Sequence, residues 1–175
     1  PAAARIEAFD RSLLAVMKDG PALGARGRLR KLEPVVQDTF DLPLMTRYAV
    51  GPTGWAAMSE ADHQALVRAF AKLTAASYAH NFERYAGERF DVTPTVQSRG
   101  ADKVVQTRLT PGSGAPVELT YRMRQSGGTW KIVDVYYGAV SQLTTRRSDF
   151  AAPLASGGAK GLLAHLDAAS AKLLQ

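Results

Sequence analysis

Two neighbouring segments in the second half of the chain have the residue pattern of a β-hairpin. In residues 117–124 apolar and polar side chains alternate, which is typical of an antiparallel strand with one buried face. Residues 130–137 place apolar side chains on both faces, as a central strand does when both of its faces are covered. Gly127 and Gly128 between them can adopt the positive φ values of a tight turn. The apolar face of the first strand consists of Val117, Leu119, Tyr121 and Met123.

Two further strands are expected before this hairpin, at residues 90–97 and 103–110. In the second of them, apolar and Thr side chains alternate with polar ones from Val105 to Leu109. Pro94 has no backbone N–H to donate, so it indicates that the first strand lies at an edge of the sheet. Together the four segments predict a twisted, four-stranded antiparallel sheet.

Helices are expected before the strands, because apolar residues there recur every three to four positions. An amphipathic helix is predicted at residues 3–17, and the sequence Asp-Gly-Pro at residues 19–21 ends it. A second helix follows at residues 23–40, where Pro34 predicts a kink or a break. Asp41 can cap a short third helix.

The longest helix is expected to begin at Ser59, because Ser59 and Asp62 have the spacing of a capping box. No Gly or Pro interrupts it before Tyr85, so it would extend for about 40 Å. After Gly138 the helical pattern returns, breaks at residues 156–158 and resumes in a last helix. The order of helices, sheet and helices predicts an α+β fold.

The composition is that of a single globular domain that covers residues 1–175. Hydrophobic residues make up 46% of the chain and charged residues 22%, and no run of about 18 apolar residues predicts a membrane span. The first four residues, Pro-Ala-Ala-Ala, are similar to the flank left when an export signal is removed, so export is expected. Cysteine is absent, which excludes disulfides and thiolate chemistry but does not choose a compartment.

The net charge of +6 favours an anionic partner, which leaves nucleic acid, anionic lipid headgroups and an acidic protein surface as candidates. The alternative is that this charge only maintains solubility. No aromatic residues that could stack on bases interleave with the basic side chains of the sheet, so nucleic-acid binding is not expected. These basic side chains are Arg108, Arg122, Arg124 and Lys131.

No motif predicts a cofactor, a metal ion or an activated serine. His63, His80 and His165 lack the spacing of metal ligands. A G-x-S-x-G sequence is absent, and residues 156–161 lack the residue order of a phosphate-binding loop. Catalysis by a nucleophile or a metal centre is therefore not expected.

Asp134 is the one candidate for acid–base catalysis. It lies between two valines in the strand expected to be most buried, and a carboxylate in an apolar cavity has a raised pKa and can act as a general base. Isomerases with a cone-shaped α+β fold use such a residue. The alternative is that Asp134 pairs with an arginine or accepts hydrogen bonds from backbone N–H groups. An enzyme acting on a small apolar substrate is thus the rival to a binding protein.

The helices and the apolar sheet face direct a set of large hydrophobic residues toward a common space. Such a set is typical of an ordinary core, and a cavity for lipid needs the same residue types, so composition does not separate the two. The residues expected to line the space are Val36, Phe40, Leu44, Met45, Tyr48, Phe70, Leu73, Tyr78, Leu109, Leu119, Tyr121 and Met123.

Three segments resemble the MlaC family of periplasmic lipid-shuttling proteins, also called toluene-tolerance auxiliary proteins. Together with the long helix they cover nearly the whole chain in the order found in the family. Residues 141–150 are similar to the hopanoid-associated branch, HpnM, more than to the general phospholipid branch. The three segments are residues 40–51 with Trp55, Tyr121 with residues 130–135, and residues 138–141 with Arg146, Arg147, Phe150 and residues 161–163.

The resemblance implies a twisted antiparallel sheet cupped by several helices around an apolar cavity, in an NTF2-like or cystatin-like layout. It also implies a monomeric periplasmic carrier, without enzymatic activity, that holds phospholipid or hopanoid by its apolar part. Such a carrier moves lipid between an inner-membrane transporter and an outer-membrane lipoprotein complex and supports the lipid asymmetry of the outer membrane. The resemblance does not choose between the two lipids, and it gives no role to Arg146 and Arg147.

Overall fold

The computed structural model describes all 175 residues, and its helices and strands follow the predicted order. Four helices come first, then six strands, and finally one long helix. The helices are α1 (Ala2–Thr39), α2 (Leu42–Val50), α3 (Pro52–Ala56), α4 (Glu60–Asn81) and α5 (Gln142–Leu173). The strands are β1 (Arg89–Val92), β2 (Gln97–Arg99), β3 (Asp102–Thr110), β4 (Val117–Ser126), β5 (Thr129–Tyr137) and β6 (Val140–Ser141).

The strands form one antiparallel sheet in the order β1-β3-β4-β5-β6, with β2 also paired to β3. The predicted strand at residues 90–97 is in fact two short strands separated at Pro94, and both pair with β3. The predicted hairpin is confirmed: Ser126 pairs with Thr129, and the two glycines between them have positive φ. The α+β fold class is therefore as predicted, with two short strands added at the edges.

A β-bulge explains why residues 130–137 do not alternate. Met123 pairs with Ile132 and Arg122 pairs with Asp134, so Val133 has no partner on β4. An extra residue of this kind bends a strand and changes the direction of the side chains beyond it. The consecutive valine and aspartate of β5 thus belong to a local irregularity. Residues 132–135 are all buried, so the expectation of a strand covered on both faces is confirmed for the middle of β5.

The predicted division of the first 40 residues into two helices is confirmed, but its position is wrong. The first helix continues through residues 19–21, and no break occurs at Pro34. The break lies at Gly24, with φ 67° and ψ 170°. This backbone conformation reverses the direction of the chain. A positive φ is strained for residues with a Cβ, so the reversal occurs at a glycine. Gly20 instead allows close packing, because a Cβ there would lie 2.2 Å from the Glu83 carbonyl oxygen.

The other helices agree better with the sequence. The side chain of Asp41 accepts a hydrogen bond from the backbone N–H of Leu44 and caps α2. Ser59 caps α4 by accepting from the N–H of Asp62, although α4 ends at Asn81 and not at the predicted Tyr85. The predicted break at residues 156–158 is confirmed by the positive φ at Gly158 in α5.

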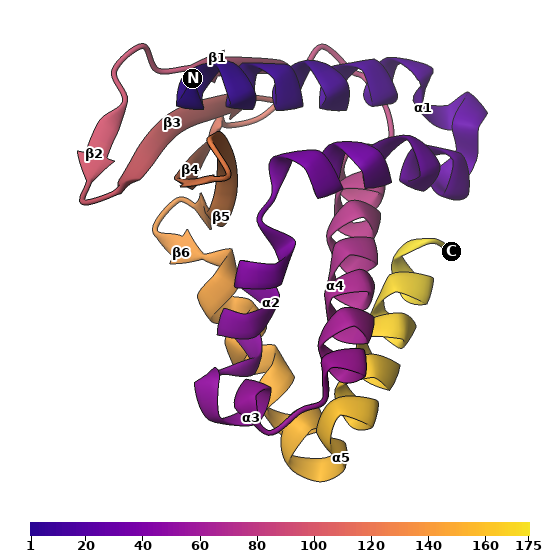
Figure 1. Ribbon diagram of the computed structural model, residues 1–175. Helices are drawn as coiled ribbons and strands as arrows, with labels where there is room; N and C mark the ends of the chain where they lie inside the picture. Colours follow the sequence, from indigo (N-terminus) through magenta and orange to yellow (C-terminus); the bar gives the residue numbers. More distant parts are fainter.

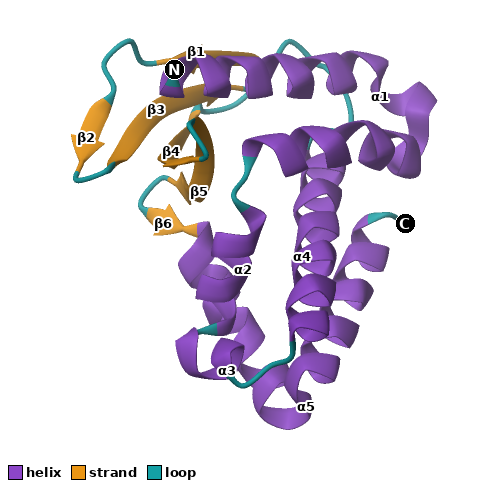
Figure 2. Ribbon diagram, viewed as in Figure 1, coloured by secondary structure: helices purple, strands orange, loops and turns teal.

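The first half of α1 lies over the sheet, and its second half runs back across the end of α4 (Figure 1). Helices α2, α4 and α5 form a separate lobe beyond the sheet (Figure 2). The hydrophobic core joins both parts through α1, α4 and the inner face of the sheet. None of the helices is long and apolar enough to cross a lipid bilayer.

Candidate functional site

An apolar pocket of about 480 Å³ opens between the inner face of the sheet and the helical lobe. Eleven of its 16 lining residues are hydrophobic, and strands β3 to β5 and helices α2, α4 and α5 all contribute. A pocket of roughly 300–1,000 Å³ with mainly apolar walls is typical of small-molecule sites. We call it the apolar pocket; it is lined by Phe40, Met45, Phe70, Thr74, Ser77, Tyr78, Asn81, Phe82, Leu109, Val117, Leu119, Val135, Tyr137, Gln142, Leu143 and Arg146.

The structure brings half of the twelve predicted lining residues to this pocket. Those six are Phe40, Met45, Phe70, Tyr78, Leu109 and Leu119.

The other six predicted residues lie elsewhere. Val36, Leu73, Tyr121 and Met123 are buried and pack in the hydrophobic core. Leu44 and Tyr48 line a different pocket. A pattern of apolar positions shows which residues leave water, and it does not show which of them border an unfilled space. That the twelve residues contact lipid stays a prediction.

The rim of the apolar pocket was missed by the sequence analysis. Val117 and Tyr137 are 42% and 36% exposed there, which is unusual for large hydrophobic side chains. Polar groups from α4 and α5 lie beside them. The guanidinium of Arg146 is 3.4 Å from the hydroxyl of Ser77, and no carboxylate forms an ion pair with it. Burial lowers the pKa of Arg146, against the opposing effect of Asp149.

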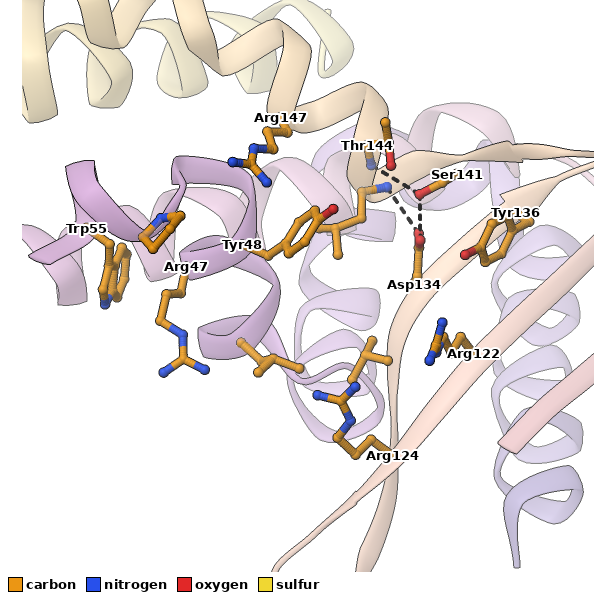
Figure 3. Close-up of a pocket in the computed structure, with 14 residues that line it drawn as sticks. Arg47, Tyr48, Trp55, Arg122, Arg124, Asp134, Tyr136, Ser141, Thr144 and Arg147 are labelled. Carbon is orange, nitrogen blue, oxygen red and sulfur yellow. Dashed lines mark hydrogen bonds between the residues drawn. The ribbon is translucent and has the colours of Figure 1, made fainter. Parts of the chain in front are cut away.

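A second pocket, of about 820 Å³, lies against the outer face of the sheet (Figure 3). Helices α2 and α3, strands β4 and β5 and the start of α5 enclose it. We call it the arginine pocket, because four arginines line it. Its lining residues are Leu44, Arg47, Tyr48, Pro52, Trp55, Arg122, Arg124, Val133, Asp134, Tyr136, Ser141, Leu143, Thr144 and Arg147.

Asp134, the candidate general base, is held by hydrogen bonds on both carboxylate oxygens. Its Oδ1 accepts from the backbone N–H groups of Val135, at 2.7 Å, and Leu143, at 3.1 Å. The hydroxyl of Ser141 donates to Oδ2, and Ser141 Oγ accepts from the N–H of Thr144 (Figure 3). Asp134 and Ser141 therefore cap the first turn of α5. This is the alternative interpretation that the sequence analysis left open.

A buried carboxyl group lies in the core beneath the sheet. Asp10, on α1, is 4% exposed, and neither of its oxygens has a hydrogen-bond partner. Burial, with a smaller effect from Glu7, raises its pKa from 3.8 to about 7. The Tyr121 hydroxyl is also buried without a partner, and its pKa is raised first by burial and then by Asp10. The amphipathic pattern of residues 3–17 gave no indication of this burial.

No group of three or more His, Asp or Glu side chains is arranged to hold a metal ion. The polar groups described above bind backbone, cap a helix or remain unpaired. The geometry therefore offers two pockets of opposite character, one apolar and one cationic, on the two faces of a single sheet.

Comparisons with known proteins agree with this geometry. The structure is similar to that of the phospholipid-binding protein from Ralstonia solanacearum, solved in complex with a phospholipid, with a TM-score of 0.81 and 26% sequence identity. The match covers 99% of each of the two chains. The family model described as MlaC protein matches residues 7–168, which is nearly the whole sequence. The chain therefore belongs to the MlaC family.

Proposed function

We propose that this protein is a lipid carrier that holds the apolar part of a phospholipid or a hopanoid in the apolar pocket. The observation that carries the proposal is an open pocket, mainly apolar, between the sheet and α4 in a member of the MlaC family. The similar protein from Ralstonia solanacearum is a phospholipid-binding protein, which supports a phospholipid as the first candidate. No second function is favoured, since Asp134 caps a helix.

The need for such a pocket follows from the free energy of exposing lipid to water. Moving two acyl chains of about 15 methylenes each from the bilayer into water would cost on the order of 24 kcal/mol, at about 0.8 kcal/mol per methylene. A carrier must offer an environment nearly equal to the bilayer, because a far more favourable one would never release the lipid. A pocket with apolar walls and an open mouth meets both conditions.

The distribution of polar groups suggests how the lipid is oriented. Phe40, Phe70 and Leu119 are at most 2% exposed and form an apolar inner wall. Arg146 lies among the polar residues of the same pocket without a carboxylate partner. A phosphate is the natural counter-ion for a guanidinium in this position. We infer that the hydrocarbon lies inward and that the headgroup lies near Arg146.

The cellular role rests on the family. We propose that the protein works in the periplasm, as a monomer, and moves lipid between an inner-membrane transporter and an outer-membrane lipoprotein complex. The hopanoid alternative rests on residues 141–150, which comprise the last residue of β6 and the start of α5. Because Arg146 in this segment lines the apolar pocket, the segment can influence which lipid is held.

Native mass spectrometry of the freshly purified protein, followed by organic extraction, tests the proposal. We expect a bound species whose mass and extract identify it as phospholipid or triterpenoid. Ser77→Trp, which fills the pocket from α4, should abolish its retention, whereas His80→Trp, on the exposed face of the same helix, should preserve it. A protein free of lipid, or equal retention by both variants, would overturn the carrier function.

A further inference from the structure

The arginine pocket has no part in holding the apolar portion of a lipid, and its construction indicates a ligand of its own. It lies on the sheet face opposite the apolar pocket, because Arg122 and Arg124 alternate along β4 with the inward-facing Tyr121 and Met123. Helices α2 and α5 lie between the pockets. Helix α2 gives Leu44 to one and Met45 to the other, and α5 gives Arg147 to one and Arg146 to the other, while Leu143 borders both.

Positive charge is in excess in the arginine pocket. Arg122 and Arg124 share a single carboxylate, that of the buried Asp102, at 2.6 and 2.7 Å. Arg47 and Arg147 form no ion pair. Asp134, the one carboxylate among the lining residues, already accepts three hydrogen bonds. Two of the four guanidinium groups thus share the one carboxylate of Asp102, and the other two, those of Arg47 and Arg147, have no carboxylate partner.

The arginines are supplied by separate elements, and several are held in place. Arg47 comes from α2, Arg122 and Arg124 come from β4, and Arg147 comes from α5 (Figure 3). The guanidinium of Arg147 lies 5.2 Å from the ring centroid of Tyr48, within the range of a cation–π contact. Donors that are oriented before binding lose less conformational entropy when a ligand arrives.

The aromatic wall of the pocket is also fixed. Trp55, on α3, stacks on His63 with 3.9 Å between ring centroids, and a ring nitrogen of His63 is 2.7 Å from the Trp55 carbonyl oxygen. The pocket is therefore a preformed concave site with cationic donors on several sides. A planar guanidinium group can donate two parallel hydrogen bonds to two oxygens of one phosphate, and it remains charged at physiological pH.

We propose that the arginine pocket is a second binding site, which takes a phosphoryl anion, either the headgroup of a phospholipid or a free phosphate ester. With a free phosphate ester as its ligand, the site goes beyond the carrier function; with the headgroup of the carried lipid as its ligand, it rests on that proposed function. Arg47 and Arg147 are its principal donors, since no carboxylate neutralises them.

The two tryptophans of the chain allow a direct test. Trp55 lines the arginine pocket, whereas Trp130 lies on β5 next to the turn and is not part of the pocket. Titration with sn-glycerol 3-phosphate, at constant ionic strength, should shift the indole N–H resonance of Trp55 in a saturable way and leave that of Trp130 unchanged. An equal response to sodium chloride would overturn the proposal, because it would show only screening of charge.

Variants locate the binding. Arg47→Gln and Arg147→Gln should each weaken glycerol phosphate binding by about tenfold, which corresponds to the loss of one charge-assisted hydrogen bond. Arg26→Gln and Arg84→Gln change the net charge equally at exposed positions outside the pocket and should have no effect. Equal weakening by all four variants would overturn the site. So would binding of an acidic peptide, such as oligoglutamate, without binding of glycerol phosphate.

The Ser77→Trp variant distinguishes the two sources of phosphate. If the headgroup of the carried lipid occupies the site, glycerol phosphate should not shift the Trp55 resonance of the lipid-loaded wild type but should shift that of Ser77→Trp. If a free phosphate ester is the ligand, the Trp55 resonance should shift in both proteins. Either result supports the site. A wild type that responds but retains no lipid would support the anion site while the carrier function fails. No response in any form would overturn the anion site alone.

Discussion

Arg146 and Arg147 are consecutive in the sequence, yet they line different pockets. Arg146 belongs to the apolar pocket, and Arg147 belongs to the arginine pocket. Successive side chains on an α-helix point about 100° apart, and α5 begins at the edge of the sheet, where the two pockets approach each other. A pair of residues that the sequence presents as one basic motif therefore has two separate roles.

This separation predicts opposite results for two matched substitutions. Arg146→Ala should reduce the retention of anionic phospholipid by about tenfold, because it removes the cation beside the expected headgroup position. Arg147→Ala should leave retention unchanged if the lipid headgroup stays at Arg146. The ratio of lipid-bound to free protein in native mass spectra measures both. Equal loss in the two variants would show that the headgroup reaches the arginine pocket.

Asp10 predicts a pH dependence of stability. Its pKa is raised from 3.8 in the unfolded chain to about 7 in the fold, mainly by burial beside Tyr78 and Tyr121 and also by Glu7. An acid with a raised pKa does not destabilise the fold below pH 3.8. Its cost grows as the pH rises from 3.8 to 7, and then remains constant at about 4 kcal/mol.

Asp10→Asn should remove that pH-dependent cost. We expect the variant to gain stability relative to the wild type between pH 4 and pH 8, by up to about 4 kcal/mol, as measured by urea unfolding at the two pH values. Asp167→Asn, at an exposed position on α5, is the control and should show no such change. A stability difference that does not vary with pH would contradict the raised pKa.

The carboxylate of Asp102 should stabilise the sheet in the opposite pH direction. Hydrogen bonds from Arg124 and Arg122 lower its pKa, so its contribution is complete above pH 3.8 and disappears as the pH falls through the lowered value. Asp102→Asn should cost about 2 kcal/mol at pH 7, a value discounted because the two arginines are partly exposed. Asp91→Asn, in an exposed pair with Arg89, should cost less than about 0.5 kcal/mol.

Asp134→Asn separates the carrier from its enzymatic rival. The amide loses an acceptor oxygen at the start of α5, so we expect a loss of stability of about 1 kcal/mol, similar to that of Ser141→Ala, which removes the other cap. Lipid retention should be unchanged, because neither side chain lines the apolar pocket. Thermal unfolding and native mass spectrometry measure the two effects. Loss of lipid from a folded Asp134→Asn would refute the purely structural role.

Sequence signals predicted the structure correctly where the interaction joins residues that are close in the sequence. Ser59 and Asp41 cap the helices that they were expected to cap, because a cap depends on a hydrogen bond three residues away. Gly127 and Gly128 form the expected turn for the same reason. The proline signals failed in α1, where the reversal lies at Gly24.

The lining of the sites required the three-dimensional arrangement. Leu119 and Tyr121 have the same place in the alternating pattern, but Leu119 borders the apolar pocket while Tyr121 lies in the core. Such differences depend on contacts between segments that are distant in the sequence. The burial of Asp10 was invisible for the same reason.

The sequence by itself determined the α+β class, the hairpin and the caps, because alternation, glycine turns and capping act over a few residues. Its likeness to the MlaC family also gave the lipid hypothesis before any coordinates. Only the tertiary structure decided that the sheet separates an apolar pocket from a cationic one. Whether a buried position faces packed atoms or an opening depends on how distant elements approach one another, and a one-dimensional pattern carries no such distances.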